Sequence, residues 1–225
     1  MSDIATLIDR VRREAERESF PIDTPIYESA KKDPRQPVLY AGNLESQLCF
    51  FGRDLGRDEV REGQPLIGAA GTLVREGFFL AWQGRKPKNK AELLAVLDRI
   101  FLTNTVPYKP PGNKAYSEEV KARFRPFIEQ LLVLHWQGDH IITLGTEACK
   151  WFTPYGKPGE VDRFFLQGDR FYNKLRITLT ATDDAGVSHQ KPAVLMPLPH
   201  PSPLNQRYYA LFPDMLQKRL NDFAF

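Results

Sequence analysis

Short apolar segments of the kind that form β-strands alternate along this chain with amphipathic segments of the kind that form helices. The strand-like segments are residues 37–41, 47–51, 100–106, 140–144, 175–181 and 193–198. The helix-like segments are residues 3–18, a stretch that ends at Trp82, residues 90–98, a stretch after Ser117, residues 146–152 and residues 213–224. Such alternation is typical of α/β folds, in which helices cover both faces of a mostly parallel sheet. We therefore expect an α/β fold.

Length and composition narrow the class of protein. The chain has 225 residues, of which 42% are apolar and 26% charged, and this composition is typical of a globular protein. No apolar run approaches the roughly 18 residues that span a bilayer, and the charged N-terminal segment does not resemble a signal peptide. Two cysteines, Cys49 and Cys149, cannot form a disulfide scaffold, so we expect a cytoplasmic protein. The net charge of +3 permits a polyanionic partner.

Polar loops follow three of the expected strands. They contain Arg53 and Asp54, the segment from Asn104 to Asn113, and the sequence His200-Pro201-Ser202. In parallel sheets, ligands bind beyond the carboxyl ends of the strands, so these loops predict one shared cleft. We expect a single domain over residues 1–225, with an N-terminal helix at 3–18, a motif-bearing core from about 37 to 210 and a C-terminal helix at 213–224.

Common phosphate and metal motifs are missing. Gly63 and Gly68 have the spacing of a phosphate-binding P-loop, but alanines stand where its Lys and Ser or Thr are required. The turn from Gly52 to Gly56 lacks the third glycine of a dinucleotide-binding fingerprint. His135 and His140 have no third ligand nearby, so we expect no metal site.

Individual polar residues at the strand ends have both a structural and a functional interpretation. Asp54 can cap a turn or present a carboxylate to a substrate, and the two are equally compatible with its position. Asn104 is more often a strand terminator, yet its amide also suits reading the edge of a base. His200 lies between two prolines, which stiffen the backbone on either side of the imidazole and favour a functional role.

Five segments carry a resemblance to a known family. They are residues 38–56, the glycine-rich segment 63–71, the strand and proline-rich loop 102–114, the strand–Gly–helix segment 141–148 and residues 200–204. In this order and spacing they resemble the uracil-DNA glycosylase superfamily, and most of all its family 4, the iron–sulfur type. The resemblance covers residues 37–210. It implies a three-layer α/β/α fold with a central, mostly parallel four-stranded sheet.

The same resemblance implies a cleft that binds a nucleotide flipped out of DNA. Asp54 and His200 would be catalytic, with His200 stabilising negative charge on the departing base. The base-binding residues would be Gly52, Arg53, Glu59, Leu66 and Asn104. The DNA-binding residues would be Gly68, Gly71, Lys109, Asn113, Lys114, Pro201, Ser202, Leu204 and Arg207. Among these, Leu204 would enter the base stack, and backbone N–H groups near residues 68–71 and 201–202 would hold phosphates.

The chain departs from the family 4 pattern at several positions. Arg53 stands where that pattern has a glutamate, and Asp54 follows at the place of the catalytic aspartate of family 1. Leu66 replaces an aromatic residue that would stack on the base. Tyr108 and Phe124 replace cysteines, and the chain has too few cysteines for a Cys-ligated cluster, so we expect no cofactor.

The resulting hypothesis is a monomeric, nucleoid-associated DNA glycosylase that hydrolytically releases uracil or a related deaminated base during base excision repair. Asp54 is expected to supply the carboxylate, and Glu59 is the alternative acid or a residue that excludes thymine. One alternative is a member of the same fold that binds DNA or a modified base with little or no catalysis. A second alternative is an α/β protein that binds small nucleosides or nucleotides.

Overall fold

The central element of the fold is a six-stranded sheet, seen in a computed structural model that describes residues 3–203 and 205–223. The strands are β1 (Tyr40–Gly42), β2 (Leu48–Gly52), β3 (Phe101–Asn104), β4 (His140–Thr143), β5 (Leu175–Thr182) and β6 (Ser188–Leu195), in the order β1-β3-β2-β4-β6-β5. The four inner strands are parallel to one another, and β1 and β5 pair antiparallel at the two edges. The α/β prediction is confirmed, and the sheet has six strands instead of four.

The antiparallel edges explain the difference in strand number. β5 and β6 form one long hairpin that pairs from Leu175 with Leu195 to Thr182 with Ser188. A hairpin needs only a short turn between its strands, whereas parallel strands need a crossover connection. Of the strand expected at 193–198, only residues 193–195 belong to β6, which begins at Ser188 and ends at Leu195.

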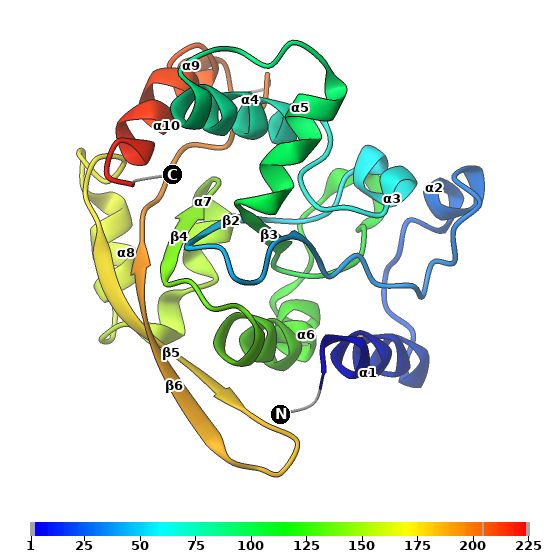
Figure 1. The fold of residues 1–225 in the computed structure, drawn as a ribbon. Coiled ribbons are helices and arrows are strands. Elements are labelled where there is room, and N and C mark those ends of the chain that lie inside the picture. Colours follow the sequence, from blue (N-terminus) through cyan, green and yellow to red (C-terminus); the bar gives the residue numbers. More distant parts are fainter. Residues whose placement is uncertain (1–2, 204, 224–225) are drawn as a thin grey trace.

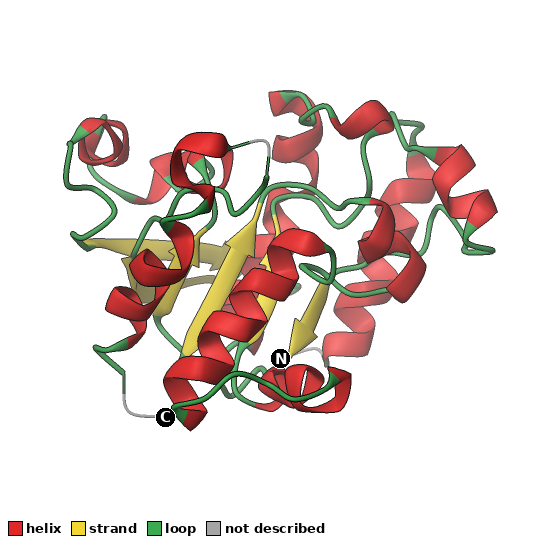
Figure 2. Cartoon of the chain, turned by 90° about the horizontal axis from the view of Figure 1, so that it is seen from above, coloured by secondary structure: helices red, strands yellow, loops and turns green. Residues whose placement is uncertain are grey.

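Helices cover both faces of the sheet, as expected for three layers. They are α1 (Ile4–Arg17), α2 (Thr24–Ser29), α3 (Arg57–Glu62), α4 (Ala69–Gln83), α5 (Lys90–Ala95), α6 (Glu118–Gln130), α7 (Thr146–Lys150), α8 (Glu160–Leu166), α9 (Gln206–Tyr209) and α10 (Phe212–Leu220). Figure 1 shows α4 and α10 on one side of the sheet and α1 and α6 on the other, and Figure 2 shows the strands grouped between helices. No helix in the described part of the chain is long and apolar enough to cross a membrane.

The alternation of side chains along β2 builds the two hydrophobic layers. Cys49 and Phe51 join the core that contains α1 and α6, whereas Phe50, between them, joins the core that contains α4 and α10. Successive residues of a strand point to opposite faces, so a strand buried on both faces reads as a continuous apolar run. β2 is buried over its full length, Leu48–Gly52.

Local capping sets where two of the expected helices begin. The Asn89 side chain accepts a hydrogen bond from the Glu92 amide at 2.9 Å and begins α5. The Ser117 hydroxyl accepts one from the Val120 amide at 3.4 Å and begins α6. Both caps satisfy backbone N–H groups that have no partner inside the helix.

Candidate active site

A cleft of about 1040 Å³ lies where the loops after β2, β3 and β6 meet. The register of the parallel strands places Gly52 of β2 beside Asn104 of β3, which brings their loops together. The cleft is lined by these residues from the sequence prediction: Arg53, Asp54, Glu59, Leu66, Gly68, Asn104, Lys109, His200 and Ser202. The predicted convergence of three loops on one cleft is therefore confirmed.

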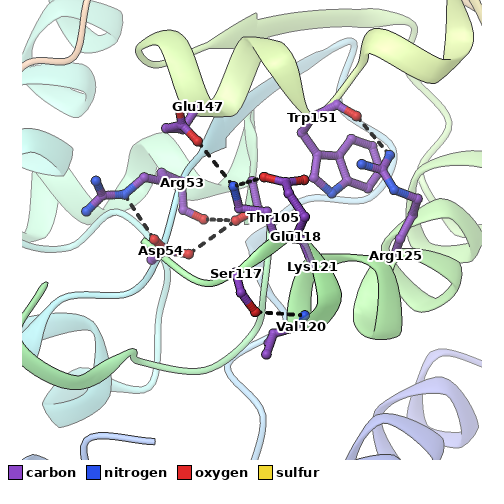
Figure 3. A network of polar contacts seen from close by, with 10 residues as sticks. All are labelled: Arg53, Asp54, Thr105, Ser117, Glu118, Val120, Lys121, Arg125, Glu147 and Trp151. Carbon is purple, nitrogen blue, oxygen red and sulfur yellow. Dashed lines mark hydrogen bonds and ion pairs between the residues drawn. The ribbon is translucent and has the colours of Figure 1, made fainter. Parts of the chain in front are cut away.

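Asp54 is a buried carboxylate at the inner wall of the cleft. Its side chain is 2% exposed, and its Oδ2 lies 3.0 Å from Nε of Arg53 (Figure 3). The Thr105 hydroxyl lies 3.3 Å from Oδ1. Burial raises the pKa of Asp54, while the charges of Arg53 and Lys121 act in the opposite direction. The result is a poorly solvated carboxylate whose raised pKa is partly offset by the two cations.

Lys121 supports this arrangement from α6. Its ammonium group is held by Glu118 at 2.8 Å and by Glu147 at 3.1 Å, and its side chain is only 7% exposed (Figure 3). The ion pairs favour the charged form of the lysine, and this charge lowers the pKa of Asp54. This residue was not predicted from the sequence, because a lysine on an amphipathic helix normally lies in solvent.

Asn104 ends β3 with its side chain in the protein interior. It is 2% exposed, and its Oδ1 has no hydrogen-bond partner in the described part of the chain. A Cβ added at Gly52 would lie 2.7 Å from its Nδ2, so a larger residue there would displace the Asn104 amide. A buried amide oxygen without a partner is costly unless a ligand supplies one, which makes Asn104 a candidate for base recognition.

His200 lies at the rim of the cleft, after β6. The surrounding protein lowers the pKa of its imidazole by desolvation, and the charge of Arg53 lowers it further. A Cβ added at Gly145 would lie 3.0 Å from Cβ of His200, and Gly145 has a φ of +92°. Only glycine tolerates both the conformation and the close approach. The strand–Gly–helix segment therefore makes room for a neutral histidine.

Glu59 holds backbone groups at the edge of the cleft. Its Oε2 accepts the Gly56 N–H at 3.0 Å, and its Oε1 accepts the N–H groups of Ile67 at 3.1 Å and Gly68 at 2.9 Å. The Gly68 amide, which was expected to hold a phosphate, donates to Glu59 in this structure. Gly71 is buried, and a Cβ there would lie 1.6 Å from the Leu66 carbonyl oxygen, so glycine is required at this position by close packing.

Lys109 is likewise occupied within the protein. It is 2% exposed, and its ammonium group lies 2.6 Å from Asp23 and 3.0 Å from the Pro110 carbonyl. A phosphate contact by this lysine would have to compete with Asp23. Asp23 precedes α2, and both Asp23 and Ile26 line the cleft. No local sequence signal links this segment to the cleft, because the pairing joins residues far apart in the chain.

Some of the remaining residues that were expected to contact DNA are exposed, and others are buried or hydrogen-bonded within the protein. Lys114 and Arg207 are exposed, as expected for residues that meet phosphates. Pro201 is buried, and the Ser202 amide, which was expected to hold a phosphate, donates to the His200 carbonyl at 2.9 Å in this structure. Leu204 and the side chain of Asn113 lie outside the described residues.

Tyr108 and Phe124, which the resemblance places at positions of family 4 cysteines, belong to an aromatic cluster. Tyr108 and Phe124 are fully buried with ring centroids 5.3 Å apart, and Phe20 packs on both rings at 5.3 and 5.0 Å. The two cysteines of the chain lie elsewhere, Cys49 on β2 and Cys149 on α7. Burial raises the pKa of both thiols, that of Cys149 to about 11. These side chains do not fit a Cys-ligated iron–sulfur cluster.

Sequence comparison finds relatives among type-4 uracil-DNA glycosylases. The chain is 28% identical to that of Sulfurisphaera tokodaii over 120 residues, which is 53% of this chain and 48% of the relative. It is 28% identical to that of Thermotoga maritima over 116 residues, 51% and 53% of the two chains. It is 33% identical to that of Archaeoglobus fulgidus over 111 residues, 49% of each chain. The matched stretch thus spans about half the length of these curated relatives.

The match to the family as a whole extends further along the chain. Residues 39–224 match the family model described as the uracil DNA glycosylase superfamily. This range includes all six strands and each of the three loops that meet at the cleft. On this evidence, the chain belongs to the uracil-DNA glycosylase superfamily.

Proposed function

We propose that this protein is a monofunctional DNA glycosylase, which flips uracil or a related deaminated base into the cleft and releases it by hydrolysis. The observation that carries the proposal is the meeting of Asp54, Asn104 and His200 at one cleft. They provide a carboxylate, a base-reading amide and a neutral hydrogen-bond donor. A single domain that acts as a monomer on DNA, in the cytoplasm and during base excision repair, belongs to the same proposal.

Recognition of the base falls to Asn104. An extruded base exposes its Watson–Crick edge, which carries both a donor and acceptors. The unpartnered Oδ1 of Asn104 accepts the imide N–H of uracil, and the amide Nδ2 donates to a neighbouring carbonyl. Leu66 lines the same cleft and forms an apolar wall against the face of the base.

Bond cleavage falls to His200 and Asp54. As the bond between C1′ of the sugar and the base nitrogen breaks, its electron pair leaves with the base and the sugar becomes cationic. His200, neutral because its pKa is lowered, donates an N–H to the carbonyl oxygen on which the negative charge gathers. Asp54 stabilises the cationic sugar and accepts a hydrogen bond from the water that attacks C1′. The water supplies hydroxide to C1′ and its proton to the departing base.

Arg53 favours the ionised form of the Asp54 carboxyl group. Its guanidinium is always protonated and has no acceptor, so it cannot be the general base. Its Nε lies 3.0 Å from Oδ2 of Asp54, where its charge opposes the rise in the pKa of that carboxyl. The arginine therefore offsets the desolvation of the buried acid.

The second candidate is a member of the fold that binds DNA or a modified base without cleaving it. The ion pair between Arg53 and Asp54 favours this second candidate, because an arginine paired to Asp54 can hold the carboxylate away from water. The two candidates differ only in whether the base is released.

The test is single-turnover base release from oligonucleotides that contain uracil, hypoxanthine, xanthine or a thymine mismatch. We expect release of at least one deaminated base by the unmodified protein. Asp54→Asn should reduce the rate by about a hundredfold to ten-thousandfold while DNA binding remains. Asp58→Asn, the same isosteric change at a neighbouring residue of the cleft, is the matched control. Binding without release by the unmodified protein would select the second candidate.

A further inference from the structure

Arg75, in the second turn of α4, is a charged residue in the protein core. It is 1% exposed, and its Nη1 donates a hydrogen bond to the carbonyl oxygen of Leu66. Its Nε and Nη2 have no hydrogen-bond partner in the described part of the chain. Burial lowers the pKa of this guanidinium to about 10. A buried cation with so few partners is costly, so the one contact that it makes calls for an explanation.

That contact holds a residue with an unfavourable backbone. Leu66 has a φ of +53°, in the left-handed region that residues with a Cβ rarely adopt. The carbonyl oxygen of Leu66 lies against the first turn of α4. A Cβ added at Gly71 would lie 1.6 Å from this oxygen. Residues four apart lie on the same face of a helix, so Arg75 stands one turn beyond Gly71 and reaches the same oxygen.

The opposite side of the same segment is held by Glu59. Its Oε1 accepts the N–H groups of Ile67 and Gly68 at 3.1 and 2.9 Å. The carbonyl of Leu66 and the two amides that follow it are therefore bound by a cation and by a carboxylate. The charge of Glu59 also favours the protonated form of Arg75, which links the two sides. We call Arg75, Glu59 and the segment 66–68 the loop clamp.

Arg219 provides a comparison within the same protein. It is also buried, at 3% exposure, and burial lowers its pKa to about 10 as well. Its guanidinium donates to three carbonyls, those of Arg170, Asn173 and Pro197. Arg219 thus ties several segments together, whereas the hydrogen bond of Arg75 goes to one residue that lines the cleft.

We infer that Arg75 is a positioning residue that fixes Leu66 as the wall of the base pocket and thereby determines how well the flipped base is held. The effect of Arg75 on the flipped base rests on the proposed function. Its effect on the backbone of segment 66–68 rests only on the contacts of the loop clamp. Arg75 does not touch the substrate. It acts through the backbone of Leu66.

The test is a double-mutant cycle with Arg75→Met and Leu66→Ala, read by single-turnover release of uracil over a range of protein concentrations. A small displacement of a positioning contact costs up to about a hundredfold in rate, so we expect Arg75→Met to lower the efficiency by about tenfold to a hundredfold. In the Leu66→Ala background the same change should cost less than threefold. Arg75→Lys should restore part of the loss. The matched control, Arg219→Met, should show no coupling to Leu66→Ala.

Amide hydrogen exchange measures the loop clamp without any catalysis. Exchange at Ile67 and Gly68 should be at least tenfold faster in Arg75→Met and unchanged in Arg219→Met. If the unmodified protein releases no base, the proposed function fails, and exchange alone decides whether the clamp exists. If Arg75→Met exchanges at the original rate, or if its effect on release multiplies with that of Leu66→Ala, the inference is overturned. Should Arg75→Met fail to fold, Arg75→Gln, which also removes the cation, takes its place in both measurements.

Discussion

At the scale of single residues, the environment of Asp54 predicts the pH dependence of base release. Burial raises the pKa of this carboxyl above its usual 3.8, and catalysis needs the ionised form, so the rate should fall as pH decreases through the raised value. Arg53→Gln removes a charge that lowers the pKa of both Asp54 and His200. Both pKa values then rise, and the acidic limb of the pH–rate profile should move to higher pH. Arg57→Gln, an exposed neighbour, is the control, and an unmoved limb in Arg53→Gln would contradict the prediction.

The charge of Asp54 is required for the proposed catalysis but is expected to destabilise the folded protein. The pKa of Asp54 is raised on folding, so its charge opposes folding above that pKa, and this cost is lost as pH falls towards 3.8. Asp54→Asn should therefore unfold at a higher temperature than the unmodified protein at neutral pH, and the difference should shrink at acidic pH. Thermal unfolding at several pH values measures this. A lower unfolding temperature for Asp54→Asn at neutral pH would show that the carboxylate stabilises the fold.

At the scale of elements, the aromatic cluster of Phe20, Tyr108 and Phe124 predicts a protein without iron. These rings join the segment after α1 to the loop after β3 and to α6. Removing a fully buried phenylalanine leaves a cavity, so Phe124→Ala should lower the free energy of unfolding by about 3–5 kcal/mol in denaturant titrations. The purified protein should be colourless and contain no stoichiometric iron. Iron bound at one cluster per chain would refute the packing role of these rings.

The position of Leu66 at the cleft predicts that an aromatic side chain there would increase the affinity for uracil-containing DNA. Leu66 already has a positive φ, and phenylalanine has the same Cβ, so Leu66→Phe makes no new demand on the backbone. A ring adds the π-face that leucine lacks, and stacking of a base on an aromatic side chain contributes roughly 1–3 kcal/mol. Leu66→Phe in the Asp54→Asn background should bind uracil-containing DNA more tightly, in a fluorescence titration, than Asp54→Asn alone. Equal affinities would show that Leu66 does not contact the base.

At the scale of the whole molecule, the distribution of charge predicts salt-sensitive DNA binding despite the small net charge. Arg57, Lys114 and Arg207 are exposed on the loops and short helices around the cleft. Each of them that meets a phosphate should contribute about one unit to the slope of log affinity against log salt. Replacing each by alanine should reduce that slope, whereas Arg176→Ala on the edge strand β5 should not. A flat salt dependence for a duplex oligonucleotide would contradict DNA as the partner.

Sequence by itself determined the class of fold and the place of the cleft. Both depend on local patterns, because apolar periodicity sets which segments become strands and helices, and the carboxyl ends of parallel strands must meet at one edge. The motif residues Asp54, Asn104 and His200 could be found for the same reason, since each follows an apolar strand. The resemblance to family 4 also indicated that Tyr108 and Phe124 stand in place of cysteines.

Only the tertiary structure decided which polar groups remain available at the cleft. Lys109 is neutralised by Asp23, the Gly68 amide donates to Glu59, and Arg75 holds the Leu66 carbonyl. These partners come from different elements. The antiparallel pairing of β1 and β5 at the two edges of the sheet was likewise decided by packing, although both segments were expected to be strands. Such contacts depend on how elements pack in space, and the desolvation that selects them exists only once the core is formed. Local periodicity therefore predicts on which strand, helix or loop a residue lies, but it does not predict which group its side chain contacts.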